Sequence, residues 1–112
     1  MANGWTAIRV AGSGSSRYPS PDILAGNVIR KLALEAKITK ERSKYFSNDD
    51  INQLREFSES FGAEPWIAVK FKSHDWLFLA LEDLKKTGMG FVISSEFAKI
   101  RGLSFEELIK NS

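Results

Sequence analysis

The segment "PDILAGNVIRKLALEAK", residues 21–37, combines strand-forming apolar residues with charged side chains. Asp22, Glu35 and Lys37 stand among residues typical of a strand beside a hydrophobic core. Removing a carboxylate or an ammonium group from water is costly unless the group is paired or bound to a ligand. These three residues therefore either face water or form a site.

The same segment predicts a β-hairpin. "DILAG" (22–26) and "VIRKLALEAKI" (28–38) are typical of two strands joined by a tight turn at Gly26-Asn27. Because side chains alternate along a strand, Glu35 and Lys37 project from the same face. That face also holds Ile29, Lys31 and Ala33, and the opposite face holds Leu32, Leu34, Ala36 and Ile38.

The rest of the chain predicts further strands and two helices. A helix begins at Ser47 or Asn48 and runs to about Phe61, with Gly62 as its stop, and Ser104 with Glu107 makes a capping box for a short last helix. The expected strands are "WTAIRVA" (5–11), "WIAVKF" (66–71) and "WLFLAL" (76–81), the last two joined by a turn at "KSHD" (72–75). This order predicts an α/β or α+β domain on a mixed sheet.

Composition limits the class of protein. A chain of 112 residues with 43% hydrophobic residues can bury one modest core, so residues 1–112 are expected to form a single domain. No apolar run approaches the roughly 18 residues of a membrane helix, and "MANGWTAIRV" lacks the pattern of a signal peptide. We therefore expect a soluble cytoplasmic protein with no membrane partner. The absence of cysteine excludes disulfides and thiolate zinc sites.

Positive charge is concentrated in the first part of the chain. Residues 1–44 hold eight Lys or Arg against three acids, whereas residues 45–112 hold eight bases against eleven acids. Such asymmetry indicates a polyanion partner on one face.

The charged residues of the hairpin can form a metal site. The turn folds one strand back on the other, which can bring Asp22 and Glu35 within reach of one Mg²⁺, with the Ala36 carbonyl as a further oxygen ligand. Lys37 could then orient a metal-bound water and offset charge on a phosphate, which implies phosphodiester hydrolysis. An E-x-K triplet is common, and the pattern alone favours an exposed strand edge with protective charges.

Other polar residues are candidates for binding DNA phosphates. The loop "AGSGSSRYPSP" (11–21) offers the hydroxyls of Ser13 and Ser15 and the guanidinium of Arg17, although a plain flexible linker has the same composition. Lys40 and Arg42 follow the strand that carries Glu35 and are either phosphate contacts or a solvated connector. Trp5, Trp66 and Trp76 each adjoin an apolar strand, which favours core or interface packing over base stacking.

Longer stretches of the sequence resemble a known family. "GWTAIRVAGSGSSRYPSPDILAGN" (4–27), "LALEAK" (32–37), "FGAEPWIAVKF" (61–71) and "WLF" (76–78) are similar, in order, to the archaeal Holliday junction resolvases of the PD-(D/E)xK nuclease superfamily. The resemblance covers nearly the whole chain and reverses the preference for a bare strand edge. It implies an α/β, restriction-endonuclease-like mixed β-sheet flanked by helices. It also implies a homodimer that nicks opposed strands of four-way junction DNA during recombination and repair, using Mg²⁺, with Mn²⁺ as a substitute.

The resemblance also assigns roles to single residues. Asp22 and Glu35 match the metal ligands of the motif, and Lys37 matches its catalytic lysine. Arg9 and Ser13 match a segment implicated in DNA contact, and Lys70 matches a further family position that we include among the DNA-binding candidates.

The sequence departs from the family pattern at its start. Family members begin with a helix that carries another glutamate of the metal site, whereas "MANGW" resembles only the end of that helix. No residue here can be given that glutamate's role. Either this sequence omits a first segment that carries it, or the protein lacks it, and without this acidic ligand metal binding should be weaker. Two alternatives to an active resolvase therefore stay open: a junction-binding protein without catalysis, and a related nuclease with another DNA substrate.

Overall fold

The computed structural model describes residues 4–10 and 21–110, which form two β-sheets and three α-helices. The larger sheet has five strands in the order β1-β2-β3-β5-β6, and the smaller has three in the order β4-β8-β7. The strands of the larger sheet are β1 (Thr6–Arg9), β2 (Ile23–Gly26), β3 (Lys31–Thr39), β5 (Glu64–Phe71) and β6 (Leu77–Ala80). The remaining elements are β4 (Ser43–Ser47), β7 (Lys85–Lys86), β8 (Gly90–Ser94), a 3₁₀ turn (Leu81–Asp83), α1 (Asn48–Phe61), α2 (Ser95–Arg101) and α3 (Phe105–Lys110).

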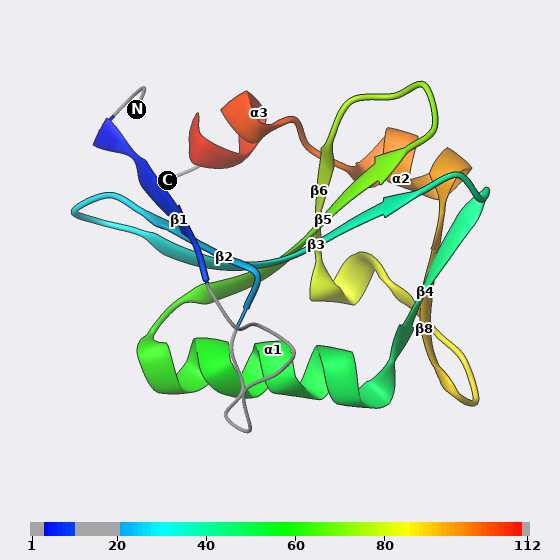
Figure 1. The fold of residues 1–112 in the computed structure, drawn as a ribbon, viewed down its shortest axis with the longest axis horizontal. Coiled ribbons are helices and arrows are strands. Elements are labelled where there is room, and N and C mark those ends of the chain that lie inside the picture. Colours follow the sequence, from blue (N-terminus) through cyan, green and yellow to red (C-terminus); the bar gives the residue numbers. More distant parts are fainter. Residues whose placement is uncertain (1–3, 11–20, 111–112) are drawn as a thin grey trace.

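The larger sheet is mixed, as the sequence predicts, and β3 is its central strand. β3 pairs antiparallel with β2 and parallel with β5, while β1 and β6 extend the two sides in antiparallel fashion. A parallel pair needs a crossover connection, and here the chain between β3 and β5 contains β4 and α1. The crossover carries α1 across one face of the sheet (Figure 1).

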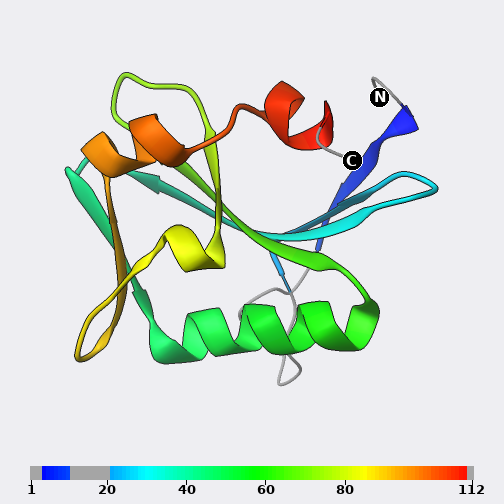
Figure 2. The same ribbon diagram turned by 180° about the vertical axis from the view of Figure 1, so that it is seen from behind.

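Each face of the larger sheet has its own core. On the face of α1, the strand residues Ala33, Ile67 and Val69 pack with Ile51 and Leu54 of the helix, and the smaller sheet closes the same cluster. On the other face, residues of β3, β5 and β6 pack with α3 and Trp5; this second cluster includes Leu32, Leu34, Ala68, Phe78, Leu108 and Ile109. Figure 2 shows the same layers from behind, with α1 and α3 on opposite sides of the sheet.

Local capping signals place two helices where the sequence predicts them. The hydroxyl of Ser47 accepts a hydrogen bond from the Asp50 amide at 3.0 Å, and Gly62 ends the helix in the left-handed region at φ 77°. At the last helix, Ser104 and Glu107 exchange the two bonds of a capping box, at 2.8 and 3.1 Å. No helix in the described part of the chain is long and apolar enough to cross a membrane.

The predicted hairpin turn is wrong by two residues. The turn spans Asn27–Arg30 rather than lying at Gly26-Asn27, with the Asn27 amide bonded to the Arg30 carbonyl at 2.9 Å. The side chain of Asn27 accepts hydrogen bonds from the amides of Ile29 and Arg30, at 2.8 and 2.7 Å, and so forms the turn itself. Val28 and Ile29 lie at its exposed tip and are not part of a strand.

Arg30, at the end of this turn, joins four parts of the structure. Its guanidinium donates two hydrogen bonds of 2.8 Å to the Glu64 carboxylate at the start of β5 and one of 2.8 Å to the Leu108 carbonyl in α3. It also lies 5.6 Å from the ring centroid of Trp5. The hydrogen bonds from Arg30 lower the pKa of the Glu64 carboxyl group, so the charged pair stabilises the fold.

Replacing Glu64 by Gln should lower the free energy of unfolding at pH 7 by about 1 kcal/mol, because the Glu64 side chain is partly exposed and solvent screens the pair. The ion pair stabilises the fold above the unfolded-state pKa of Glu64 and loses its effect as the pH falls through the lowered folded-state pKa. Urea unfolding at pH 7 and pH 3 measures the difference, with Glu59→Gln on the exposed face of α1 as the control. An equal loss at both pH values, or in the control, would contradict the assignment.

Candidate active site

Asp22 is held against β3 at the point where β2 begins. β2 pairs with β3 only over Lys31–Leu34, and the Asp22 amide donates to the Leu34 carbonyl at 3.0 Å. Two residues further along β3, the Ala36 amide donates to Asp22 Oδ2 at 3.0 Å. The Asp22 carboxylate thus continues the hydrogen bonding of the strand with a side-chain oxygen.

The backbone of Ala36 faces the same edge. Within a strand, the amide and the carbonyl of one residue point to the same side. Since the Ala36 amide bonds Asp22, its carbonyl also lies on the Asp22 side of β3. The Ala36 carbonyl oxygen, which the sequence suggests as a metal ligand, therefore lies on the same edge of β3 as Asp22.

Glu35 and Lys37 share the face of the sheet that packs against α1. Their β5 partners in the parallel register are Ile67 and Val69, both in the core on that face. Lys37 Nζ lies 3.4 Å from Glu35 Oε2, and the side chains are 36% and 16% exposed, respectively. The prediction that these two residues project together is confirmed.

The environment of Glu35 disfavours its negative charge. Partial burial is the largest cause that raises the pKa of the Glu35 carboxyl group, and the charge of Asp22 raises it further. Lys37 opposes both through its charge and hydrogen bond, and Asp50 at the start of α1 adds a smaller upward contribution. The two carboxylates are close enough to repel each other, and a bound cation would reduce that repulsion.

The donors at this position are oxygen atoms. In the described residues no group of three or more Asp, Glu, His or Cys side chains could hold a metal ion. The two carboxylates and the Ala36 carbonyl form a partial set, and Mg²⁺ commonly completes such a set with water. The chemistry of these donors therefore fits Mg²⁺.

The candidate DNA-binding residues lie in different places. Lys40 and Arg42 line a hollow of about 260 Å³ where β3 and β5 end, together with Lys72 and Lys99. Arg9 pairs with Ile23, and Lys70 pairs with Ile38, which places both on the face opposite Glu35. Lys70 Nζ also donates to the His74 carbonyl at 2.9 Å. Ser13, Ser15 and Arg17 lie outside the residues that the structure describes.

Sequence reasoning did not identify several charged residues near the site. Asp50 is visible in the sequence as a first-turn helix acid, but its effect on Glu35 depends on how α1 packs on the sheet. Lys72 and Lys99 join Lys40 through folding of distant segments. No spacing signal in the sequence indicates that proximity.

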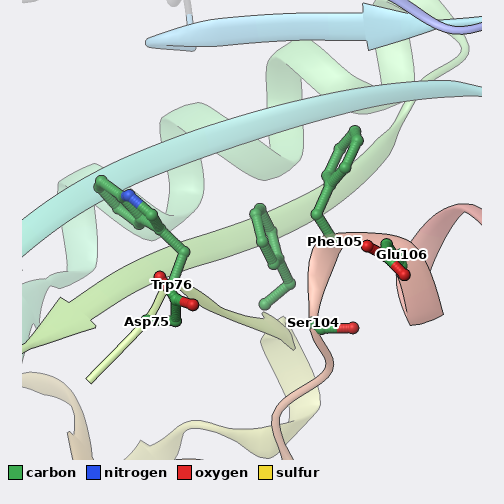
Figure 3. A pocket seen from close by; sticks show the side chains of 6 residues that line it. Asp75, Trp76, Ser104, Phe105 and Glu106 are labelled. Atoms are coloured by element: carbon green, nitrogen blue, oxygen red, sulfur yellow. The ribbon is translucent and has the colours of Figure 1, made fainter. Parts of the chain in front are cut away.

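A second hollow, of about 590 Å³, has a different character. It lies between β6 and α3, on the face opposite the carboxylates, and Figure 3 shows the rings of Trp76 and Phe105 directed toward the sheet. Its charged lining residues, Asp75 and Glu106, are acidic and do not suit a phosphate. Trp5 is buried, while Trp66 and Trp76 pack partly buried against the same cluster, which agrees with the packing role predicted for them.

Comparison with known proteins gives consistent matches. The family model described as archaeal Holliday junction resolvase (Hjc) matches residues 1–112. The chain is 41% identical over 111 residues to the crossover junction endodeoxyribonuclease Hjc of Archaeoglobus fulgidus, covering 93% of this chain and 82% of the relative. It is 35% identical over 112 residues to the crossover junction endodeoxyribonuclease Hje of Saccharolobus islandicus, covering 95% and 83%.

A solved structure supports the same assignment. The structure of Archaeoglobus fulgidus Hjc, described as a Holliday junction resolvase from an archaeal hyperthermophile, matches with a TM-score of 0.90 at 41% identity and covers 96% of this chain and 86% of that one. The restriction-endonuclease-like mixed sheet expected from the sequence is thereby confirmed. This chain belongs to the archaeal Holliday junction resolvase family.

Proposed function

We propose that this protein is a Mg²⁺-dependent endonuclease that resolves four-way DNA junctions by paired phosphodiester cleavage in recombination and repair. The observation that carries the proposal is the proximity of the Asp22 and Glu35 carboxylates, with Asp22 bonded to the Ala36 amide and Lys37 Nζ 3.4 Å from Glu35 Oε2. Several relatives are named crossover junction endodeoxyribonucleases, which supports the reaction class.

Asp22, Glu35 and the Ala36 carbonyl would hold the metal ion, and Mn²⁺ would substitute for Mg²⁺ because it accepts the same hard oxygen ligands. When bound, Mg²⁺ supplies a more acidic water and stabilises the charge that develops on the phosphate. Lys37, positioned by its ion pair with Glu35, would orient the attacking water and neutralise the charge on a phosphate oxygen. Asp22 would be kept in position by the Ala36 amide throughout.

Residues outside the carboxylate site would bind the DNA backbone. Lys40 and Arg42 follow β3 directly and would contact the strand that is cut. Arg9 and Lys70, on the other face, would contact a different arm, because a four-way junction presents its arms in several directions. Ser13, Ser15 and Arg17 would bind phosphates from the 11–21 loop, as their composition suggests.

A homodimer would explain paired cleavage. Two copies related by a twofold axis carry two identical sites, each facing one of two opposed strands. The exposed apolar side chain of Phe61, stacked on Phe57 at the end of α1, is one candidate for the contact between copies.

A junction-binding protein without catalysis is the second candidate. It is favoured by the finding that the described residues gather only two of the carboxylates that a metal site commonly uses, without a third acidic side chain close enough to join them. The two candidates share the DNA-binding surface and differ only in whether the bound strands are cut.

The variant Glu35→Gln separates these candidates. Cleavage of a four-way junction should fall at least about 100-fold because a metal ligand is lost, whereas affinity for the junction should be unchanged or higher. Gel assays of cleavage and binding measure both, with Glu56→Gln on α1 as a control that keeps both properties. Full cleavage by Glu35→Gln would disprove the role of this carboxylate.

The same substitution should raise stability. The folded state binds a proton on Glu35 more tightly than the unfolded state does, so stability falls as the pH rises from about the unfolded value of 4.5 through the raised pKa. Removing the charge should therefore raise the melting temperature at pH 7, and the gain should shrink at pH 4. Thermal unfolding followed by circular dichroism tests this expectation, and a lower melting temperature at pH 7 would contradict it.

Metal binding has a readout that does not depend on activity. Because a ligand that binds only the folded state stabilises it, millimolar MgCl₂ should raise the melting temperature of the parent protein. The shift should be absent in Asp22→Asn and Glu35→Gln, and EDTA should abolish cleavage while leaving junction binding detectable. An equal shift in parent and variants would place the metal elsewhere.

A further inference from the structure

We propose that the hollow lined by Lys40, Arg42, Lys72 and Lys99 binds a backbone phosphate of the DNA and so holds the strand that passes over Glu35. The proposal rests on the proposed function, because it takes DNA as the ligand. It adds two residues, Lys72 and Lys99, and a defined location to the contacts suggested by sequence.

Three separate segments build this basic hollow. Lys40 and Arg42 come from the turn after β3, Lys72 from the turn after β5, and Lys99 from α2. These segments gather at one end of the molecule in Figure 1, where β3 ends and α2 begins. The convergence of cations from distant parts of the sequence distinguishes the hollow from an ordinary charged loop.

Hydrogen bonds shape the two turns and tie one of them to α2, while the pairing of Thr39 with Phe71 sets the ends of β3 and β5 side by side. The Ser95 amide donates to the Arg42 carbonyl at 2.7 Å, which ties the start of α2 to the turn after β3. The Thr39 hydroxyl accepts from the Glu41 amide at 3.0 Å and shapes that turn. In the other turn, the His74 amide donates to the Phe71 carbonyl at 3.1 Å. The hollow is therefore largely formed before a ligand arrives.

Its charge is not neutralised within the described part of the chain. Four cations face a single acid, Glu41, among the lining residues. No salt bridge between described residues involves any of the four cations, although Arg30, Lys37 and Arg101 elsewhere do form them. Like charges held together without counter-ions attract an anion, and the Ser73 and Ser95 side chains in the lining add hydroxyl groups that can donate to phosphate oxygens.

The hollow lies close enough to Asp22 and Glu35 for one DNA arm to contact both places. Lys40 is five residues beyond Glu35, which is roughly 16 Å along a strand at about 3.3 Å per residue. That length corresponds to a few nucleotides of duplex at about 3.4 Å per base pair. A phosphate bound here would belong to the same arm as the scissile phosphate and would fix the direction in which that arm leaves the site.

A phosphate contact of this kind would not distinguish one DNA base sequence from another. All four cationic side chains are exposed, and flexible lysines bind phosphate as point charges rather than matching base edges. The hollow should therefore strengthen binding to junctions of any sequence.

The double variant Lys72→Gln/Lys99→Gln tests the proposal, with Lys31→Gln/Lys110→Gln as a control of equal charge change on exposed lysines elsewhere. Affinity for four-way junctions of two unrelated sequences is measured in EDTA across a range of salt concentrations. The double variant should bind both about 10-fold more weakly, with the slope of log K against log salt lowered by about 1, and the control should match the parent. A complementary variant, Glu41→Gln, should bind more tightly.

Cleavage separates this proposal from the proposed function. Cleavage by the parent protein is measured separately, with Mg²⁺ and saturating protein. Unchanged affinity of the double variant, or an equal loss in the control, would overturn the phosphate site even if the parent cuts junctions. A parent that binds but never cuts would contradict the proposed function, and weaker binding by the double variant would still support the phosphate site.

Discussion

The unequal pairing of β3 on its two sides is the constraint on which the site depends. Toward β5, the parallel ladder runs from Leu32 to Thr39, whereas toward β2 the ladder ends at Leu34. The backbone of Ala36 is left facing outward at that edge, and Asp22 Oδ2 accepts its amide at 3.0 Å. This hydrogen bond gives the Ala36 amide a partner where β2 no longer pairs with β3, and it holds the Asp22 carboxylate near that of Glu35.

The same arrangement sets function against stability. Burial and the charge of Asp22 raise the pKa of the Glu35 carboxyl group, and Lys37 relieves this only in part. Other interactions offset this loss of stability. The clearest are the hydrogen bonds of Arg30, which join the β2–β3 turn to β5 and α3. Charged groups therefore serve two separate purposes: the Arg30–Glu64 ion pair holds the layers together, and two neighbouring carboxylates of like charge favour a bound cation.

Local signals in the sequence predicted much of the fold. Capping residues predicted α1 and α3, and alternation predicted that Glu35 and Lys37 share a face. The hairpin turn was misplaced because the Asn27 side chain, rather than a Gly-Asn pair, forms it. The smaller sheet and α2 were missed because β4, β7 and β8 are short and their pairing depends on residues far apart in the chain. Arg30 and Glu64, 34 positions apart, were missed for the same reason.

The most direct test of the account is to incubate the protein with an end-labelled four-way junction and a linear duplex of matching sequence, with Mg²⁺ present, and to map the products on a denaturing gel. We expect symmetric nicks in opposed strands near the branch point and an intact duplex. A junction that is bound but not cut, or nicks that appear equally in the duplex, would contradict the claim that Asp22, Glu35 and Lys37 form the cleavage site of a junction-resolving enzyme.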